Sequence, residues 1–214
     1  MDPFHERLAR IALKAAEPYG FALAGGYAVQ AHGFLSRQSS DVDIFASSRA
    51  EFDFAAAVDA VLAAFRREGL SSNAEIRSSS FARLAVASPD GERTKVEMGV
   101  DWRGNEPLRL SIGPVLHPDD AVANKVCALF GRAEVRDYVD VDAIVSSGRY
   151  AEDALLSLAM DHDPGFDRLW FAEALSAIDR LPDGLFQPYG LDPKQVSALR
   201  ERMTSWASRI RDAR

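Results

Sequence analysis

The spacing of apolar residues over the first 115 positions predicts alternating helices and short strands. The helical segments repeat apolar residues every three to four positions, whereas the strand segments alternate or form short apolar runs bounded by turn residues. A Pro89-Asp90-Gly91 turn gives the strongest hairpin signal in the chain. The predicted helices are residues 3–18, 25–32 and 49–68, and the predicted strands are residues 21–24, 41–46, 81–87 and 93–100.

From Pro118 onward the apolar period is helical. Neither an internal repeat nor a Pro/Ser-rich linker interrupts the chain. The sequence therefore predicts an α+β fold, with an α/β core over residues 1–115 and a helical region over residues 116–214. The predicted helices of the second region are residues 118–131, 135–147, 151–162, 167–180 and 192–212.

Composition narrows the classes of protein to consider. Apolar residues make up 47% of 214, which is enough for a core, and the net charge of −7 argues against broad, sequence-blind binding to nucleic acid. The single cysteine, Cys127, excludes an internal disulfide framework and a cysteine zinc site. Without a signal-peptide pattern or an apolar run of roughly 18 residues, we expect a cytoplasmic protein with no membrane partner.

Asp41 and Asp43 are the most informative pair of residues. On a strand, residues two apart project to the same face, so the two carboxylates lie together and repel each other unless a cation lies between them. Mg²⁺ is the natural occupant, because hard divalent ions prefer oxygen ligands. The upstream pair Gly25 and Gly26 allows close backbone approach to a phosphate. The alternative is two solvated acids on an edge strand.

A third carboxylate is expected on the strand over residues 93–100. Alternation places Glu97 on one face of this strand while its neighbours Val96 and Met98 point the other way. Completing a metal site would explain an acid at this position, and Asp101 is the fallback candidate. The alternative is an exposed sheet face on which Lys95 and Glu97 are simple neighbours.

Charged residues also occur on apolar helical stripes of the second region. Lys125 follows the spacing of buried residues, which costs free energy unless a counter-charge meets it, and a triphosphate is one such partner. A lysine that snorkels to the surface is the alternative. Asp137 and Asp140 share the stripe of the next predicted helix. They can pair with Lys125 and Arg132 in a structural network, or stand near the site as a base.

The segment before the aspartate pair offers further candidates. Arg37 can contact a phosphate, and Ser39 or Ser40 can bond a nucleotide or the turn backbone. No dense basic stripe locates a binding site for an acceptor. The arginines that are candidates for lining a groove are Arg66, Arg67, Arg77, Arg83, Arg103 and Arg109.

These motifs together resemble those of a known family, the AbiEii/AbiGii-type (MenT-like) toxin nucleotidyltransferases of the DNA polymerase β-type superfamily. The resemblance runs from about Gly20 to Ile144. The family often has Gly-Ser in place of Gly25-Gly26, and aspartate in place of Glu97, whose longer arm shifts the metal geometry. The matching residues are Gly25-Gly26, Asp41-x-Asp43, Glu97, Lys125 before Cys-Ala-Leu, and Arg136-Asp137-x-x-Asp140.

The resemblance implies a nucleotidyltransferase-type mixed sheet with helices, followed by a helical C-terminal half. It also implies an enzyme that binds Mg²⁺ and a nucleoside triphosphate (NTP) as substrate. By this likeness Asp41 and Asp43 bind metal, Lys125 meets the triphosphate, and Asp137 serves near the transfer step. Glu97 completes the metal site. The residues implied to contact the nucleotide are Gly25, Gly26, Arg37, Ser39, Ser40 and Lys125.

Members of this family are typically toxins of type IV toxin–antitoxin pairs, and some add nucleotides to the 3′ end of tRNA and so block translation. The expected partners are therefore an NTP, an RNA acceptor such as tRNA, and a cognate antitoxin. Two alternatives stay open. One is a small-molecule nucleotidyltransferase of the aminoglycoside type, and the other is a non-catalytic protein that binds a partner.

Overall fold

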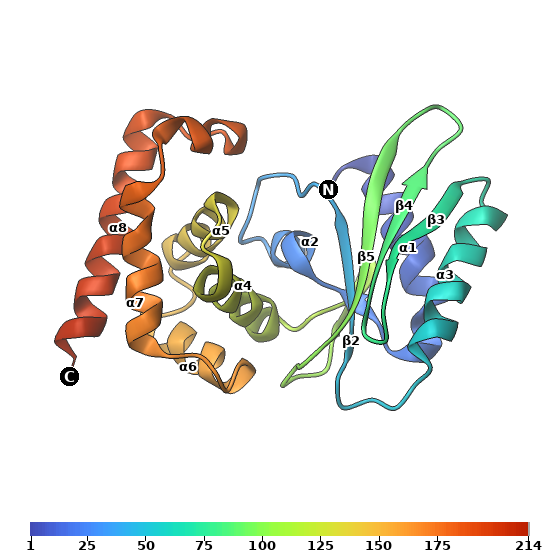
Figure 1. Ribbon diagram of the computed structural model, residues 1–214, viewed down its shortest axis with the longest axis horizontal. Helices are drawn as coiled ribbons and strands as arrows, with labels where there is room; N and C mark the ends of the chain where they lie inside the picture. The colour runs from blue at the N-terminus through green and yellow to red at the C-terminus, as the bar shows by residue number, and fades with distance from the viewer. Residues whose placement is uncertain (214) are drawn as a thin grey trace. The chain divides into compact units, whose positions relative to one another are not determined.

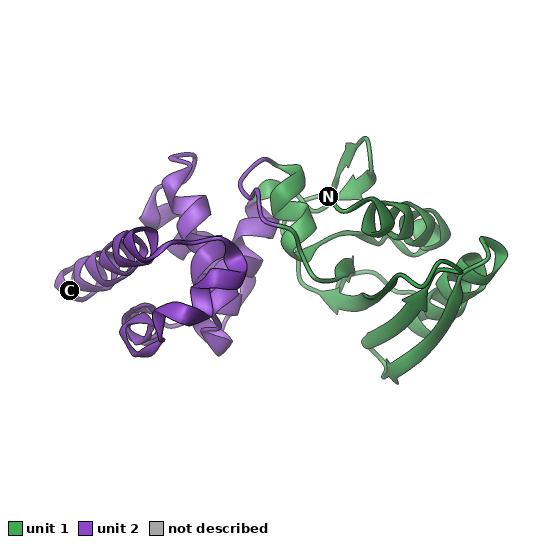
Figure 2. Ribbon diagram, turned by 90° about the horizontal axis from the view of Figure 1, so that it is seen from above, with its two compact units in different colours: residues 1–32, 38–118 green, residues 33–37, 119–214 purple. Residues whose placement is uncertain are grey.

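The computed structural model describes residues 1–213 and divides into two compact units. Unit 1 comprises residues 1–32 and 38–118, and unit 2 comprises residues 33–37 together with the chain from Asp119 onward (Figure 2). Unit 1 contains the whole sheet, and unit 2 is helical.

Unit 1 is built on a mixed seven-stranded sheet with the strand order β3-β4-β5-β2-β1-β7-β6 (Figure 1). The pairs β2–β5 and β1–β7 are parallel, and the other neighbours are antiparallel. The strands are β1 Ala22–Leu23, β2 Val42–Ser47, β3 Ser71–Arg77, β4 Phe81–Ala87, β5 Arg93–Asp101, β6 Leu108–Leu110 and β7 Gly113–Val115.

Alternation along the central strands separates a buried face from an open one. Val42 and Ile44 on β2, and Val96 and Met98 on β5, are fully buried. Helices α1 and α3 pack side by side on this face of the sheet (Figure 1). The helical segments of unit 1 are α1 Pro3–Ala15, the 3-10 helix η1 Glu17–Tyr19, α2 Gly25–Ala31 and α3 Phe54–Arg67.

Helix α3 begins later than the sequence pattern predicted. The prediction of a helix from residue 49 is wrong, because the helix starts at Phe54. Asp53 has an extended backbone and its side chain accepts a hydrogen bond from the backbone N–H of Ala56, so it caps the helix. A residue that caps a helix in this way cannot lie inside it.

Three strands were not predicted. Strand β3 is an edge strand whose residues are half-buried or exposed, so it lacks the apolar contrast by which strands are recognised. Its exposed positions carry polar residues typical of a loop, namely Ser71, Asn73 and Glu75. Strands β6 and β7 have three residues each, which is too short for a periodic signal.

Unit 2 buries a helical core around Tyr138, Phe171, Phe186 and Trp206, each of which is at most 1% exposed. The predicted helix over residues 167–180 is divided, and a 3-10 helix that was not predicted follows it. The mixed sheet and the helical second part confirm the predicted α+β fold. The segments are α4 Pro118–Arg132, α5 Val135–Ser146, α6 Glu152–His162, α7 Arg168–Ser176, η2 Ala177–Arg180, η3 Asp183–Tyr189 and α8 Pro193–Asp212. Over the described residues, none of the helices has the length and apolarity needed to span a bilayer.

Candidate active site

The open face of the sheet carries the acids that the sequence singled out. Asp43 on β2 is the direct neighbour of Glu97 on the parallel strand β5, and Glu97 in turn pairs with Arg83 on β4. The register therefore forms a row of charged residues across three strands. Neighbouring backbones in a sheet lie about 5 Å apart, so side chains in one row are within reach of one another.

Asp41 lies immediately before β2 and is half-buried, as is Asp43. Ser39 Oγ is 3.5 Å from Asp41 Oδ1, which is the outer limit of a hydrogen bond. The charge of Asp41, like that of Glu97, acts on Arg83. Asp41 therefore belongs to the same charged cluster as the row formed by Asp43, Glu97 and Arg83.

The glycine turn lies directly against Asp43. Gly25 has φ of +57°, and a Cβ added there would lie 1.8 Å from Asp43 Oδ2. The neighbouring Ala24 donates its N–H to the Asp43 carbonyl at 2.8 Å, which fixes the turn to β2. Only glycine satisfies both the left-handed backbone and the contact with the carboxylate. Gly26 follows as a buried residue of α2.

The register favours Glu97 over Asp101 as the third carboxylate. Glu97 pairs with Asp43, whereas Asp101 pairs with Ser47, four residues further along β2. Asp101 also accepts a hydrogen bond from the N–H of Trp102 at 2.8 Å. One oxygen of Glu97 accepts from Nε of Arg83 at 2.7 Å. That hydrogen bond, followed by the Glu97 charge, raises the pKa of Arg83.

The donor set fits a divalent ion that arrives with its substrate. Among residues 1–213, no group of three or more Asp, Glu, His or Cys side chains is placed to hold a metal by itself. Mg²⁺ in phosphate-transferring enzymes is usually held by one or two carboxylates together with substrate phosphates and water, not by a cage made only of protein. Asp41 and Asp43 supply such a pair, and the turn at Gly25 lies directly against Asp43.

A buried tyrosine that the sequence did not indicate supports the segment before β2. Tyr27 is 2% exposed, and its hydroxyl donates to the carbonyl of Ser39 at 3.1 Å. The ring of His5 approaches the same hydroxyl, with Nδ1 at 2.6 Å. Burial raises the pKa of Tyr27, and the charge of Asp41 adds to the rise. Its position in a helix of seven residues gives no sequence signal of this role.

In unit 2, two cations surround one buried carboxylate. The side chain of Asp140 on α5 is 0% exposed, and Nε and Nη2 of Arg37 each donate to one of its oxygens at 2.6 Å. Lys125 Nζ on α4 lies 3.0 Å from Asp140 Oδ2. Burial lowers the pKa of Arg37, but the hydrogen bond and charge of Asp140 outweigh it and leave the pKa raised. These three groups carry one net positive charge.

Asp137 is the second buried acid of α5, and its contacts favour the structural alternative. Its side chain is also 0% exposed, and Arg132 donates to both of its oxygens at 2.8 and 2.9 Å. The backbone N–H of Glu134 donates to Asp137 Oδ2 at 3.1 Å, which completes a capping box at the start of α5. Pairing of these acids with Lys125 and Arg132 was one of two alternatives drawn from the sequence, beside a role as a base, and the structure contains both ion pairs.

Several of the arginines considered for a groove are engaged by nearby groups. Arg77 pairs with Asp59, Arg83 with Glu97, and Arg109 with Glu17. Arg103 donates to the carbonyl of Gly20. These residues therefore do not form a free basic stripe.

A mixed sheet with an aspartate pair on its open face, and with Asp43 against a glycine turn, is the arrangement that the resemblance to nucleotidyltransferases implies. The chain matches the profile of the family described as "Nucleotidyl transferase AbiEii toxin, Type IV TA system" over residues 7–212. The protein therefore belongs to this family and is a nucleotidyltransferase, as the motifs predicted.

Solved structures share this fold at low identity. JHP933 from Helicobacter pylori is 20% identical, with 98% of this chain and 91% of that chain covered and a TM-score of 0.56. MenT4, a nucleotidyltransferase toxin from Mycobacterium tuberculosis, is 16% identical, with coverage of 96% and 83% and a TM-score of 0.61. No curated protein sequence matches the chain significantly.

Proposed function

We propose that the protein is the toxin of a type IV toxin–antitoxin pair. It transfers a nucleoside monophosphate (NMP) from an NTP to an RNA acceptor, the 3′ end of tRNA, and so blocks translation. The reaction depends on Mg²⁺, and a cognate antitoxin protein is the partner that restrains it. Membership of the AbiEii toxin family supports this proposal.

The observation that carries the proposal is the contact between Gly25 and the carboxylate of Asp43. Consecutive backbone N–H groups of a glycine turn form a concave site for an anion. Because this turn lies against Asp43, a phosphate bound there sits next to the carboxylate pair. A triphosphate and a cation held by Asp41 and Asp43 therefore meet at one place on the sheet.

The chemistry is a displacement at the α-phosphorus. The acceptor hydroxyl forms a new P–O bond and gives up its proton to solvent, the bond from the α-phosphorus to the oxygen shared with the β-phosphate breaks, and pyrophosphate leaves. Bound Mg²⁺ supplies Lewis-acid polarisation of the phosphate and the hydroxyl. Asp41 and Asp43 would hold the cation, and Glu97 would contribute its second oxygen, which accepts no hydrogen bond among residues 1–213. Arg83 keeps the Glu97 side chain oriented.

In unit 2 we propose a role for the net positive charge of the cluster formed by Arg37, Lys125 and Asp140. Arg37 and Lys125 place two positive charges on the single charge of Asp140, and positive groups stabilise phosphates during transfer. Lys125 is therefore proposed to act on the triphosphate, while Asp140 and Asp137 hold their partners in position. A Lys125→Met variant keeps the aliphatic stem and removes the charge.

The test is a transfer assay with the purified protein, Mg²⁺, total tRNA and each α-labelled NTP in turn. Asp43→Asn keeps the shape of the side chain and removes a metal ligand, so we expect label transfer to fall by about three orders of magnitude. Glu51→Gln, which changes an exposed acid outside the site, is the matched control and keeps full activity. Chelation of the metal is expected to stop the wild type.

Other outcomes of the transfer assay would indicate a different function for the protein. Label entering an aminoglycoside but no RNA would replace the RNA acceptor by a small molecule. Transfer that survives in Asp43→Asn would contradict the placement of the metal on the aspartate pair. An absence of label in every acceptor, with NTP binding intact, would favour the non-catalytic alternative.

A further inference from the structure

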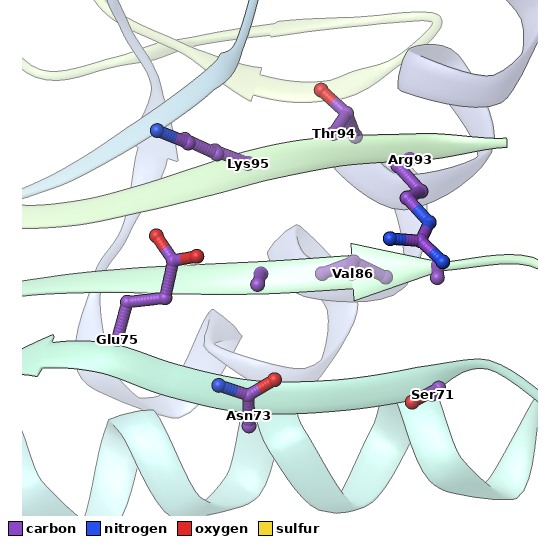
Figure 3. Close-up of a pocket in the computed structure, with 9 residues that line it drawn as sticks. Ser71, Asn73, Glu75, Val86, Arg93, Thr94 and Lys95 are labelled. Carbon is purple, nitrogen blue, oxygen red and sulfur yellow. The ribbon is translucent and has the colours of Figure 1, made fainter.

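A polar groove lies beside the candidate active site on the same face of the sheet. It crosses β3, β4 and β5 and has a volume of about 440 Å³ (Figure 3). Ala85 and Ala87 on β4 provide short side chains along its floor. In the register, Lys95 pairs with Ala85 and Arg93 with Ala87, so both basic residues stand on one wall.

The opposite wall is polar and is supplied by the edge strand β3. Asn73 pairs with Ala85, and Ser71 pairs with Ala87. Glu75 also lines the groove and acts electrostatically on Arg83. Figure 3 shows Asn73, Glu75 and Ser71 on one side and Lys95 and Arg93 on the other. The groove therefore offers two cations, one acid, and amide and hydroxyl groups for hydrogen bonding.

The two cations of this groove are exposed and have no partner among the described residues. Arg93 and Lys95 are exposed, and within residues 1–213 neither side chain makes a hydrogen bond, ion pair or ring contact. By contrast, Arg77, Arg83 and Arg109 are each paired with an acid. Cations that are exposed and not held in an ion pair are available to a ligand of opposite sign.

The groove continues directly from the carboxylate pair. Val42 on β2 pairs with Val96 on the parallel strand β5, so Asp41 and Lys95, which each precede these residues, lie side by side. Strand β5 separates β2 from β4 in the sheet, and β1 lies on the other side of β2. The groove thus extends from one side of β2, while the turn at Gly25, which follows β1, approaches from the other.

This arrangement separates the two substrates of a transfer reaction. In a displacement at phosphorus, the attacking and leaving oxygens lie roughly in line on opposite sides of the reacting phosphate. If the NTP occupies the glycine turn, the attacking hydroxyl must come from the far side of the carboxylate pair. The groove over β3, β4 and β5 begins on that side.

We propose that this groove binds the single-stranded 3′ end of the RNA acceptor, with Arg93 and Lys95 contacting its backbone phosphates. Asn73 and Ser71 on the facing wall supply hydrogen bonds to sugar or base. The inference rests on the proposed function, because it requires an RNA acceptor. It places the contacts to nucleic acid on a local pair of cations in a chain with a net charge of −7.

The test compares two double variants of equal charge change in steady-state transfer to tRNA. In Arg93→Ala/Lys95→Ala we expect the KM for tRNA to rise about tenfold, because two phosphate contacts are lost. The salt dependence of RNA binding, measured by mobility shift, becomes shallower by roughly 1.4 in log–log slope. The kcat and the KM for NTP are expected to stay within about twofold of the wild type.

The control is Lys14→Ala/Arg66→Ala, which removes two exposed charges from α1 and α3, the helices that cover the other face of the sheet. It should leave the KM for tRNA unchanged. An equal rise of the KM for tRNA in both double variants would overturn the proposal, since any loss of positive charge would then be enough to weaken RNA binding. A rise in the KM for NTP instead would make the groove part of the NTP site.

Failure of the groove proposal is separable from failure of the proposed function. If the wild type labels RNA and the Arg93→Ala/Lys95→Ala variant does so with unchanged KM, only the groove assignment is wrong. If the wild type labels no RNA with any NTP, the RNA acceptor itself is wrong. Urea unfolding of both double variants verifies that each remains folded.

Discussion

The acids of unit 1 and unit 2 lie in contrasting environments. Asp41 and Asp43 are half-buried on an open sheet face, beside a glycine turn. Asp137 and Asp140 are fully buried, and each is held by an arginine that contacts both of its oxygens. Both pairs appear in the sequence as acids among apolar residues, so the pattern alone does not distinguish them.

The difference shows how environment separates ligand-binding acids from positioning acids. A fully buried carboxylate is stable only when cations and hydrogen bonds compensate its lost hydration, and those bonds then occupy its oxygens. A half-buried carboxylate keeps access to solvent and can exchange a ligand. We therefore expect changes to the buried acids of unit 2 to act mainly on stability, and changes to the acids of the open sheet face to act mainly on transfer.

The largest effect on stability is expected at Asp140. Asp140→Asn leaves Arg37 and Lys125 without their shared counter-charge in a buried position, so the free energy of unfolding should fall by about 3 kcal/mol or more. Asp43→Asn should change it by less than about 1 kcal/mol, because the side chain is half-buried. Urea denaturation of each variant measures both values.

The control for Asp140 is Asp59→Asn, which removes one partner of an exposed ion pair with Arg77. Its expected cost is small, as for exposed pairs in general. If Asp140→Asn is no more destabilised than Asp59→Asn, the contrast between the two units is wrong. A large loss of stability in Asp43→Asn would also contradict this contrast between the two units.

An intermediate effect is expected at the glycine turn. Gly25→Ala places a Cβ against the Asp43 carboxylate and also strains a positive φ, so we expect transfer to fall by about a hundredfold as the carboxylate is displaced. Gly69→Ala is the matched control, because Gly69 has φ of +77° with no atom near its added Cβ. The control should lose about 1 to 2 kcal/mol of stability but keep full transfer. Equal activity in both variants would show that the contact with Asp43 does not matter for transfer.

The smallest expected effect is a pH dependence of stability due to Tyr138, whose position in the sequence of α5 falls between the buried acids Asp137 and Asp140. Burial raises the pKa of Tyr138 to about 12, and the charge of Asp137 adds to the rise. The folded state holds this proton more tightly than the unfolded state. The contribution of Tyr138 to the free energy of unfolding is therefore complete below about pH 10 and is lost as pH rises toward 12. The loss should reach about 1 kcal/mol by pH 11.

Tyr138→Phe isolates this contribution from that of other tyrosines, since burial also raises the pKa of Tyr27 and Tyr150. The hydroxyl of Tyr138 donates to the carbonyl of Ala174 at 2.6 Å, so the variant has a lower stability at neutral pH. Its free energy of unfolding should decline less between pH 10 and 11 than that of the wild type. Parallel declines in the two proteins would contradict the assignment.

The sequence by itself determined the elements whose periodicity is strong and the motifs whose spacing is local. The hairpin around Pro89-Asp90-Gly91, most helices of the second half and the motifs of the family follow from short-range patterns. The projection of Asp41 and Asp43 to one face follows from strand geometry alone. Apolar contrast fails where a strand is short or lies at an exposed edge, and β3, β6 and β7 were missed for that reason.

Only the tertiary structure decided which distant residues meet, because register and helix packing depend on the whole core and not on neighbours in sequence. It brought Glu97, and not Asp101, beside Asp43. It placed Arg37 on Asp140, a pairing across 103 positions that no spacing reveals. It also opened the groove that leaves Arg93 and Lys95 unpaired among the described residues. Local sequence thus specified the chemical groups, and the fold decided which of them are held by partners and which face a ligand.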